Sequence, residues 1–119
     1  MATYRFFPPA DRRQDEIWNY SREQWSEAQA EKYIRNLHKH LQALADRKKQ
    51  WRKLPNSLIV PADLNIKIYF SQYERHYVFF RELTKDSIGI MSLLHESMDM
   101  PIRLENDLKK ISDKTQNMN

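Results

Sequence analysis

"HYVFFRELTKDSIGIMSLLH", residues 76–95, contains two apolar runs that flank the polar segment "TKDS". A polar segment of this length between two strand-like runs is typical of the turn of a β-hairpin. Both runs carry apolar side chains on both faces, so neither strand has a polar face turned to solvent. The stretch therefore predicts two central strands of a sheet that is covered on both sides.

Two further segments show the two-residue alternation of a strand. "TYRFF", residues 3–7, is a short strand that Pro8 and Pro9 end. "NIKIYFS", residues 65–71, precedes the hairpin and is joined to it by the polar turn "QYER". Its alternation places Ile66, Ile68 and Phe70 on a core face and Lys67, Tyr69 and Ser71 on a face expected to meet solvent.

Two helices are predicted between these strands. The first helix has an apolar face that begins at Ala10, and it ends near Trp25. The segment "SEAQ" that follows is typical of a capping box, which predicts a second helix starting at Ser26. The second helix has a continuous apolar stripe, made of Ala30, Tyr33, Ile34, Leu37, Leu41, Leu44 and Ala45. So short a joint predicts an antiparallel helix hairpin.

The remaining segments are a connector and the C-terminus. Residues 51–63 contain two prolines and predict an irregular connector. After Pro101, Leu104, Leu108 and Ile111 form an apolar edge about two turns long, which predicts a short helix docked on the sheet. We expect one domain, residues 1–111, followed by a polar and flexible tail, residues 112–119.

The expected fold class is therefore α+β. The sheet has four strands, is mainly antiparallel, and carries the N-terminal helix hairpin on one face, in the order β-α-α-β-β-β, with a short C-terminal helix.

Composition excludes several functional classes. The 119 residues include no cysteine, a single glycine and no apolar run near the length of a membrane span, so we expect no disulfide, no phosphate-cradling loop and no membrane passage. The N-terminus lacks a signal peptide, which predicts a cytoplasmic protein. His38 and His40 lie on different faces of a helix, where they are expected to be solvated, and we expect neither a metal nor another cofactor.

Positive charge is concentrated in residues 32–53, within a net charge of +4. The only acid there is Asp46, and the cations are Lys32, Arg35, Lys39, Arg47, Lys48, Lys49, Arg52 and Lys53. Such a block either binds a phosphate backbone or is a solvated helix end, where cations interact favourably with the negative end of the helix dipole.

Three segments, which together span residues 4–104, carry a recognisable order and spacing: "YRFFPPADRRQDEIWNYSREQWSEAQAEKYIRNL", "HYVFFREL" and "IGIMSLLHESMDMPIRL". In that order and spacing the chain resembles the ParE branch of the RelE/ParE toxins. The chain differs from the family in having Ser26 where glycine is common, and in running past the usual C-terminal end.

The resemblance implies a toxin of a type II toxin–antitoxin pair, neutralised by a cognate antitoxin. The ParE branch poisons DNA gyrase, whereas the RelE branch cuts messenger RNA on the ribosome. We favour a gyrase poison that acts by binding and has no catalytic residue, with any contact to DNA made only through the antitoxin. If the protein is instead a ribonuclease, the candidate catalytic residues are His76, Arg81 and His95.

The same residues have a structural alternative. Arg81 and His95 end adjacent strands, where they can bind the carboxylates of Glu82, Glu96 or Asp99 and fix the strand ends. The two helices carry more apolar side-chain area than the core of so small a domain requires. We therefore predict that an antitoxin binds at Trp18, Trp25, Tyr33, Leu37 and Leu41. The resemblance implies a target surface after the final strand, at His95, Met98, Asp99 and Arg103.

Overall fold

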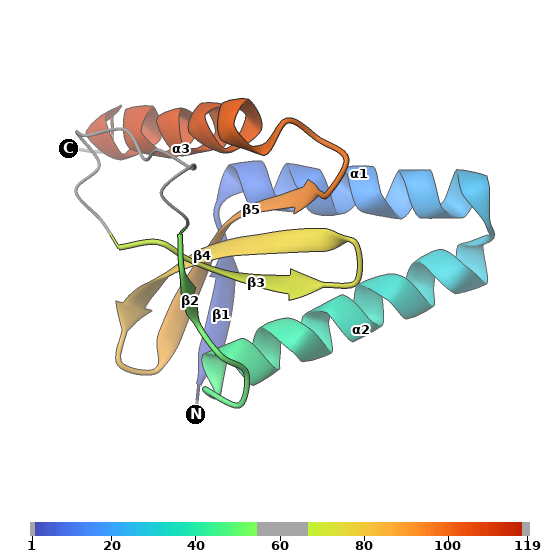
Figure 1. Ribbon diagram of the computed structural model, residues 1–119, viewed down its shortest axis with the longest axis horizontal. Helices are drawn as coiled ribbons and strands as arrows, with labels where there is room; N and C mark the ends of the chain where they lie inside the picture. The colour runs from blue at the N-terminus through green and yellow to red at the C-terminus, as the bar shows by residue number, and fades with distance from the viewer. Residues whose placement is uncertain (1, 55–66, 118–119) are drawn as a thin grey trace.

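The computed structural model describes residues 2–54 and 67–117, together with the side chains of these residues up to Ile111. Figure 1 shows its helices and strands in chain order. They are β1 (Thr3–Phe6), α1 (Pro8–Gln24), α2 (Glu27–Ala45), β2 (Arg52–Lys53), β3 (Tyr69–Tyr73), β4 (His76–Thr84), β5 (Ser87–His95) and α3 (Met100–Asn117).

The sheet has five strands in the order β1-β5-β4-β3-β2, one more than predicted. β1 runs parallel to β5, and the other neighbours are antiparallel, so the prediction of a mainly antiparallel sheet in an α+β fold is confirmed. The additional strand, β2, lies within the segment predicted to be irregular. Arg52 and Lys53 pair with Phe70 and Tyr69, and two residues are too few to show an alternating pattern in the sequence. The rest of that connector, residues 55–63, lies outside the described residues.

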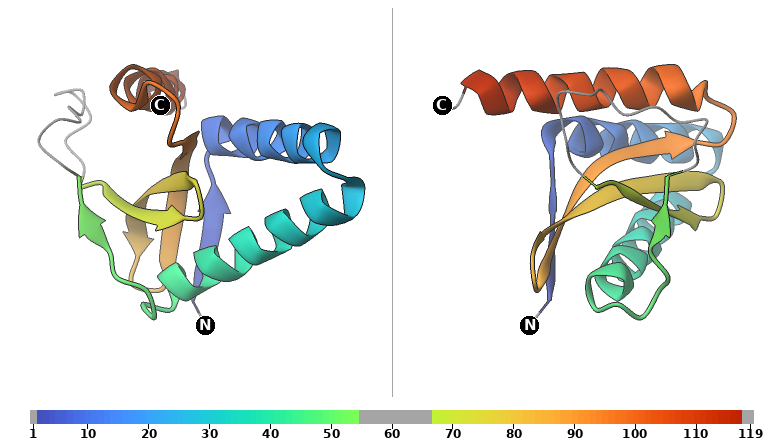
Figure 2. Two further views of the ribbon diagram at one scale, coloured as in Figure 1. Left: turned by 45° about the vertical axis from the view of Figure 1, so that its right-hand side comes forward. Right: turned by 60° about the vertical axis from the view of Figure 1, so that its left-hand side comes forward.

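The sheet is covered on both faces, as the central hairpin predicted (Figure 2). On one face, α1 and α2 enclose a cluster with β4 and β5 that includes Leu37, Leu41, Val78 and Phe80. On the other face, α3 supplies Leu104, Leu108 and Ile111, which pack with other apolar residues of the sheet. The predicted C-terminal helix therefore does cover the second face, and it continues to Asn117 rather than ending near Ile111.

The face of β3 that was expected to meet solvent is instead covered by the end of α2 and by Trp51. The Trp51 and Tyr69 rings lie 5.3 Å apart between centroids. Ser71 is only 7% exposed and shares a hydrogen bond of 2.9 Å with His40 of α2. That expectation was wrong because α2 is long enough to reach beyond the central strands. Lys67 is exposed as predicted, and Ile66 lies outside the described residues.

The helix hairpin begins and turns close to where the sequence places it. α1 starts at Pro8, earlier than Ala10, because proline has no amide hydrogen to lose in the first turn of a helix. Ser26 is the N-cap of α2, and its hydroxyl accepts a hydrogen bond from the Gln29 amide at 3.1 Å. This capped joint holds α1 and α2 as the two arms of the hairpin. Within the described part of the chain, no helix is both long and apolar enough to cross a membrane.

Candidate functional site

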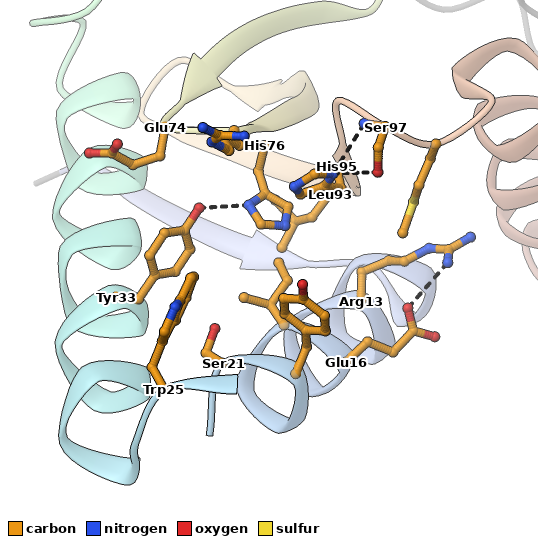
Figure 3. A pocket seen from close by; sticks show the side chains of 14 residues that line it. Arg13, Glu16, Ser21, Trp25, Tyr33, Glu74, His76, Leu93, His95 and Ser97 are labelled. Atoms are coloured by element: carbon orange, nitrogen blue, oxygen red, sulfur yellow. Dashed lines mark hydrogen bonds and ion pairs between the residues drawn. The ribbon is translucent and has the colours of Figure 1, made fainter. Parts of the chain in front are cut away.

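A pocket of about 460 Å³ opens between the two arms of the helix hairpin and the ends of β4 and β5 (Figure 3). α1 contributes Arg13, Ile17 and Tyr20, and the joint between the helices contributes Trp25. Tyr33 of α2 lies across from these residues, and His76, Leu93, His95 and Met98 close the side formed by the sheet. Charged, aromatic and apolar side chains therefore meet in one cavity, and they come from segments that are distant in the sequence.

His76 and His95 form the polar centre of this pocket. They are directly opposite in the β4–β5 pairing, and their rings lie 5.1 Å apart at an angle of 79°. The Ser97 amide donates to Nδ1 of His95 at 3.0 Å, which leaves the proton of a neutral His95 on Nε2. The Tyr33 hydroxyl lies 2.6 Å from Nδ1 of His76. Each imidazole is therefore held in a fixed orientation by a neighbouring side chain or amide.

Burial sets the protonation of His76 and Tyr33. Burial, with a smaller contribution from His95, lowers the pKa of His76 to about 4. Burial also raises the pKa of Tyr33 well above its ordinary value, with added repulsion from the charges that Tyr73 and Glu74 can carry. At neutral pH His76 is therefore uncharged and Tyr33 keeps its proton, so the Tyr33 hydroxyl can donate to His76.

Arg81 does not join the two histidines. It pairs with Gly89 in β4–β5, five residues along the strand from His76, which places the two backbones about 16 Å apart at roughly 3.3 Å per residue. The structure thus brings together two of the three candidate catalytic residues and separates the third.

The structural alternative for Arg81 and His95 named the wrong partners. Glu82 pairs with Arg47, Glu96 pairs with Arg75 at 3.7 Å, and His95 binds Ser97. Among the described residues, Arg81 has no ion pair. Arg81 thus lies apart from the two histidines and makes none of the predicted ion pairs.

The residues predicted to bind an antitoxin divide into exposed and buried ones. Trp25 is 64% exposed at the mouth of the pocket, while Trp18 and Tyr33 are half-buried. Leu37 and Leu41 are fully buried in the core and present no surface to a partner in this conformation. Tyr20, which the sequence reasoning missed, is 59% exposed and makes an edge-on contact with Trp25. Its spacing of three residues from Ile17 placed it beside the apolar face of α1, and this was the available signal.

The residues expected to bind the target extend from the pocket to the start of α3. His95 and Met98 line the pocket, and Asp99 and Arg103 are exposed beyond it. The Arg103 amide donates to the Asp99 carbonyl at 3.0 Å, which begins the hydrogen bonding of the helix. These four residues follow one another along the chain from the pocket into the first turn of α3, and we call them the strip.

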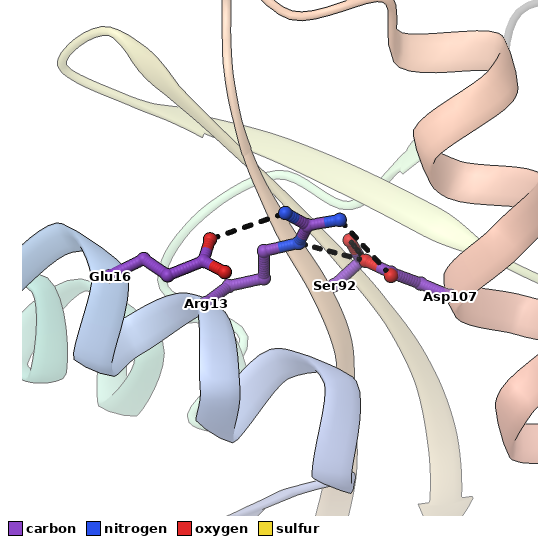
Figure 4. A network of polar contacts seen from close by, with 4 residues as sticks. All are labelled: Arg13, Glu16, Ser92 and Asp107. Atoms are coloured by element: carbon purple, nitrogen blue, oxygen red, sulfur yellow. Dashed lines mark hydrogen bonds and ion pairs between the residues drawn. The ribbon is translucent and has the colours of Figure 1, made fainter.

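A buried polar network links α3 to α1 and β5 (Figure 4). Nε and Nη2 of Arg13 donate to the Asp107 carboxylate, each at 3.3 Å, and the Ser92 hydroxyl donates to it at 2.6 Å. Asp107 is only 2% exposed, so its charge depends on these donors. Burial lowers the pKa of Arg13, but hydrogen bonding and charge attraction from Asp107, with help from Glu16, outweigh it and leave the pKa raised. The network connects α1, β5 and α3.

His38 and His40 are not solvated, contrary to the prediction. Nδ1 of His38 lies 2.7 Å from the Tyr4 hydroxyl and its Nε2 contacts Gln14, so this side chain connects β1, α1 and α2. His40 binds Ser71 of β3. Burial lowers the pKa of both histidines, and the charge of Lys49 lowers that of His40 further. Within the described residues, no group of three potential metal ligands occurs.

Comparison with known proteins gives two matches that agree with each other. The family model described as the ParE toxin of the type II toxin–antitoxin system parDE matches residues 4–100. The curated Toxin ParE of Escherichia coli is 30% identical over 93 residues, an alignment that covers 78% of this chain and 84% of the relative. The family match includes the helix hairpin and the strands that build the pocket.

Proposed function

Because the chain belongs to the ParE toxins of type II toxin–antitoxin systems, we propose that it arrests growth by binding and poisoning DNA gyrase and that a cognate antitoxin neutralises it. The family match over residues 4–100 carries this proposal. The separation of Arg81 from His76 and His95 supports it, because a toxin that acts by binding needs no assembled catalytic trio.

For the antitoxin, we propose that the contact centres on the mouth of the pocket. Trp25 and Tyr20 are large, exposed and in contact with each other, and such aromatic residues are typical binding hot spots. The pocket beside them can take an apolar side chain against Ile17 and Leu93. An acidic antitoxin segment that folds on binding would complement the net charge of +4.

The antitoxin surface is tested by pull-down with the Trp25→Ala variant and the Ile102→Ala variant as matched control. Ile102 is similarly exposed, at 56%, but lies on α3 away from the pocket. We expect Trp25→Ala to weaken antitoxin binding about 30-fold, as for a hot spot worth about 2 kcal/mol, and Ile102→Ala to have little effect. Equal binding by both variants would place the antitoxin elsewhere.

For gyrase, we propose that the strip formed by His95, Met98, Asp99 and Arg103 makes the contact. The strip lies beside the antitoxin surface, so an antitoxin bound at the pocket would also obstruct it. The test is induced expression in bacteria, with and without the antitoxin. We expect growth arrest with accumulating DNA breaks, weakened by Arg103→Glu, and normal growth when the antitoxin is present. Growth arrest without DNA breaks would contradict a gyrase poison.

A messenger RNA endonuclease is the second candidate, and the His76–His95 pair favours it. Two imidazoles in one pocket can serve as general base and general acid in cleavage next to a ribose 2′-hydroxyl. The nearest cations are already engaged, because Arg13 pairs with Asp107 and Arg75 pairs with Glu96. We therefore place this activity second. It requires that His95→Gln abolish toxicity while antitoxin binding persists.

A further inference from the structure

The turn after α2 and the short strand β2 that follows it carry a second surface. We call its four exposed cations, Lys48, Lys49, Arg52 and Lys53, the basic turn. Figure 1 shows this turn at the end of α2 that is farther from the joint with α1. From Tyr33, which lines the pocket, to Ala45 at the end of α2 is about 18 Å at 1.5 Å per residue, so the four cations lie outside the pocket, although Glu74 borders both sites.

The charge of the basic turn is not neutralised locally. Arg47, which precedes it, pairs with Glu82 and lies 3.9 Å over the Trp51 ring, so its guanidinium is already engaged. Asp46 accepts a hydrogen bond from the Gln42 side chain. None of the four cations of the basic turn forms an ion pair with another described residue.

A polar depression of about 390 Å³ lies beside these cations. Lys49 and Arg52 line it together with the neutral polar side chains of His40, Gln50, Ser71 and Gln72. His40 and Ser71 bind each other and Gln72 donates to the Glu74 carbonyl, but Gln50 and the second amide hydrogen of Gln72 can still donate. Glu74 is the one acid among the residues that line it. Cations next to neutral donors are the combination that phosphate oxygens bind, since phosphate accepts from both.

The character of the surface distinguishes between classes of partner. Protein–protein interfaces have an apolar core, whereas protein–nucleic acid interfaces are polar and positively charged. Among the described residues, the exposed large hydrophobic side chains are Tyr20, Trp25 and Ile102, and all three lie away from the basic turn. We propose that the basic turn binds the phosphodiester backbone of a nucleic acid directly and without reading its sequence.

This inference does not depend on the proposed target, because binding is measured on the purified protein without gyrase. If four cations each neutralise one phosphate of duplex DNA, the logarithm of the affinity should fall with the logarithm of salt concentration with a slope of about −3.6. Between 50 and 200 mM salt, that slope corresponds to a loss of affinity of about 150-fold.

The experiment follows the fluorescence anisotropy of a labelled 20-base-pair DNA duplex, a labelled RNA hairpin and labelled polyglutamate, each titrated at several salt concentrations. The test variant is Lys48→Gln with Lys49→Gln. The matched control is Lys109→Gln with Lys110→Gln, which removes the same charge from exposed positions on α3. We expect the test variant to bind duplex DNA at least tenfold more weakly at 100 mM salt, and its slope to shrink by about 1.8. The control should match the unmodified protein.

Three outcomes would overturn the proposal. Unchanged DNA binding in the test variant would show that the basic turn makes no contact. Equal losses in the test and control variants would show attraction by net charge only. Preferential binding of polyglutamate through Lys48 and Lys49 would identify an acidic protein segment as the partner. Binding of both nucleic acids supports the proposal, and their relative affinities show which backbone is preferred.

Discussion

Breaking the network around Asp107 should weaken the packing of α3 on the rest of the domain and lower the free energy of unfolding. The change is Asp107→Ala, which removes the acceptor of two hydrogen bonds from Arg13 and one from Ser92. Because Ser92 is fully buried, its hydroxyl would lose its partner inside the core. Arg13, with 14% of its side chain exposed, would keep only the ion pair with Glu16.

The magnitude follows from these two losses. Removing one partner of a buried ion pair costs about 3–5 kcal/mol, and an unsatisfied buried hydroxyl accounts for about 1–3 kcal/mol of such a loss. Because Arg13 keeps Glu16 and some contact with solvent, we expect the lower end, about 3 kcal/mol. Arg13→Ala should cost a similar amount, since it leaves the Asp107 carboxylate buried with Ser92 alone.

The assay is urea denaturation of the two single variants and the double variant. The double variant should be more stable than the sum of the single losses implies, by roughly 2 kcal/mol, because neither charge is then buried alone. Lys109→Ala is the control on the same helix. Its exposed pair with Glu105 should be worth less than about 0.5 kcal/mol. A cost below about 1 kcal/mol for Asp107→Ala, or strictly additive losses, would refute this account of how α3 is held.

Three other changes should have measurable effects. The free energy of unfolding should fall by roughly 2 kcal/mol between pH 7 and pH 4. The reason is that His76 takes up a proton near its ordinary pKa of 6.5 in the unfolded chain but only near pH 4 in the folded chain. Urea titrations of His76→Gln should show a shallower pH dependence. Gly89→Ala should cost about 1–3 kcal/mol in the same assay, because the added Cβ would lie 2.5 Å from the Phe7 ring. Truncation after Asp99 should leave a chain without a cooperative transition by circular dichroism, since losing buried Leu104, Leu108 and Ile111 removes roughly 5–9 kcal/mol, comparable to a whole domain's stability.

Much of the fold could be predicted because its central elements have strong local patterns. β4 and β5 are apolar on both faces, and α2 has an apolar stripe over most of its length, so each reveals its burial without knowledge of its neighbours. β2 shows no such pattern, because two exposed residues become a strand only by pairing with β3. The network of Arg13 and Asp107 also had no local signal, since the two residues lie 94 positions apart.

Part of the site was predictable from the hairpin register. Thr84 pairs with Ser87, and an uninterrupted hairpin from that pair places His76 opposite His95. The two register shifts between β4 and β5 cancel, so the observed pairing is the same. The strand rise of about 3.3 Å per residue also separates Arg81 from His76. In contrast, the aromatic mouth formed by Tyr20 and Trp25 depends on the angle between α1 and the sheet, which no local pattern encodes.

The most direct test of the central claim compares the two candidate targets with one preparation of the protein. Purified toxin is added to gyrase with plasmid DNA and ATP, and in parallel to a bacterial translation extract with a reporter messenger RNA. Our account predicts DNA trapped in a cleaved complex with gyrase, prevented by the antitoxin, and an intact messenger RNA. Cleaved messenger RNA with normal supercoiling, abolished by His95→Gln, would contradict a gyrase poison and assign the His76–His95 pair a catalytic role.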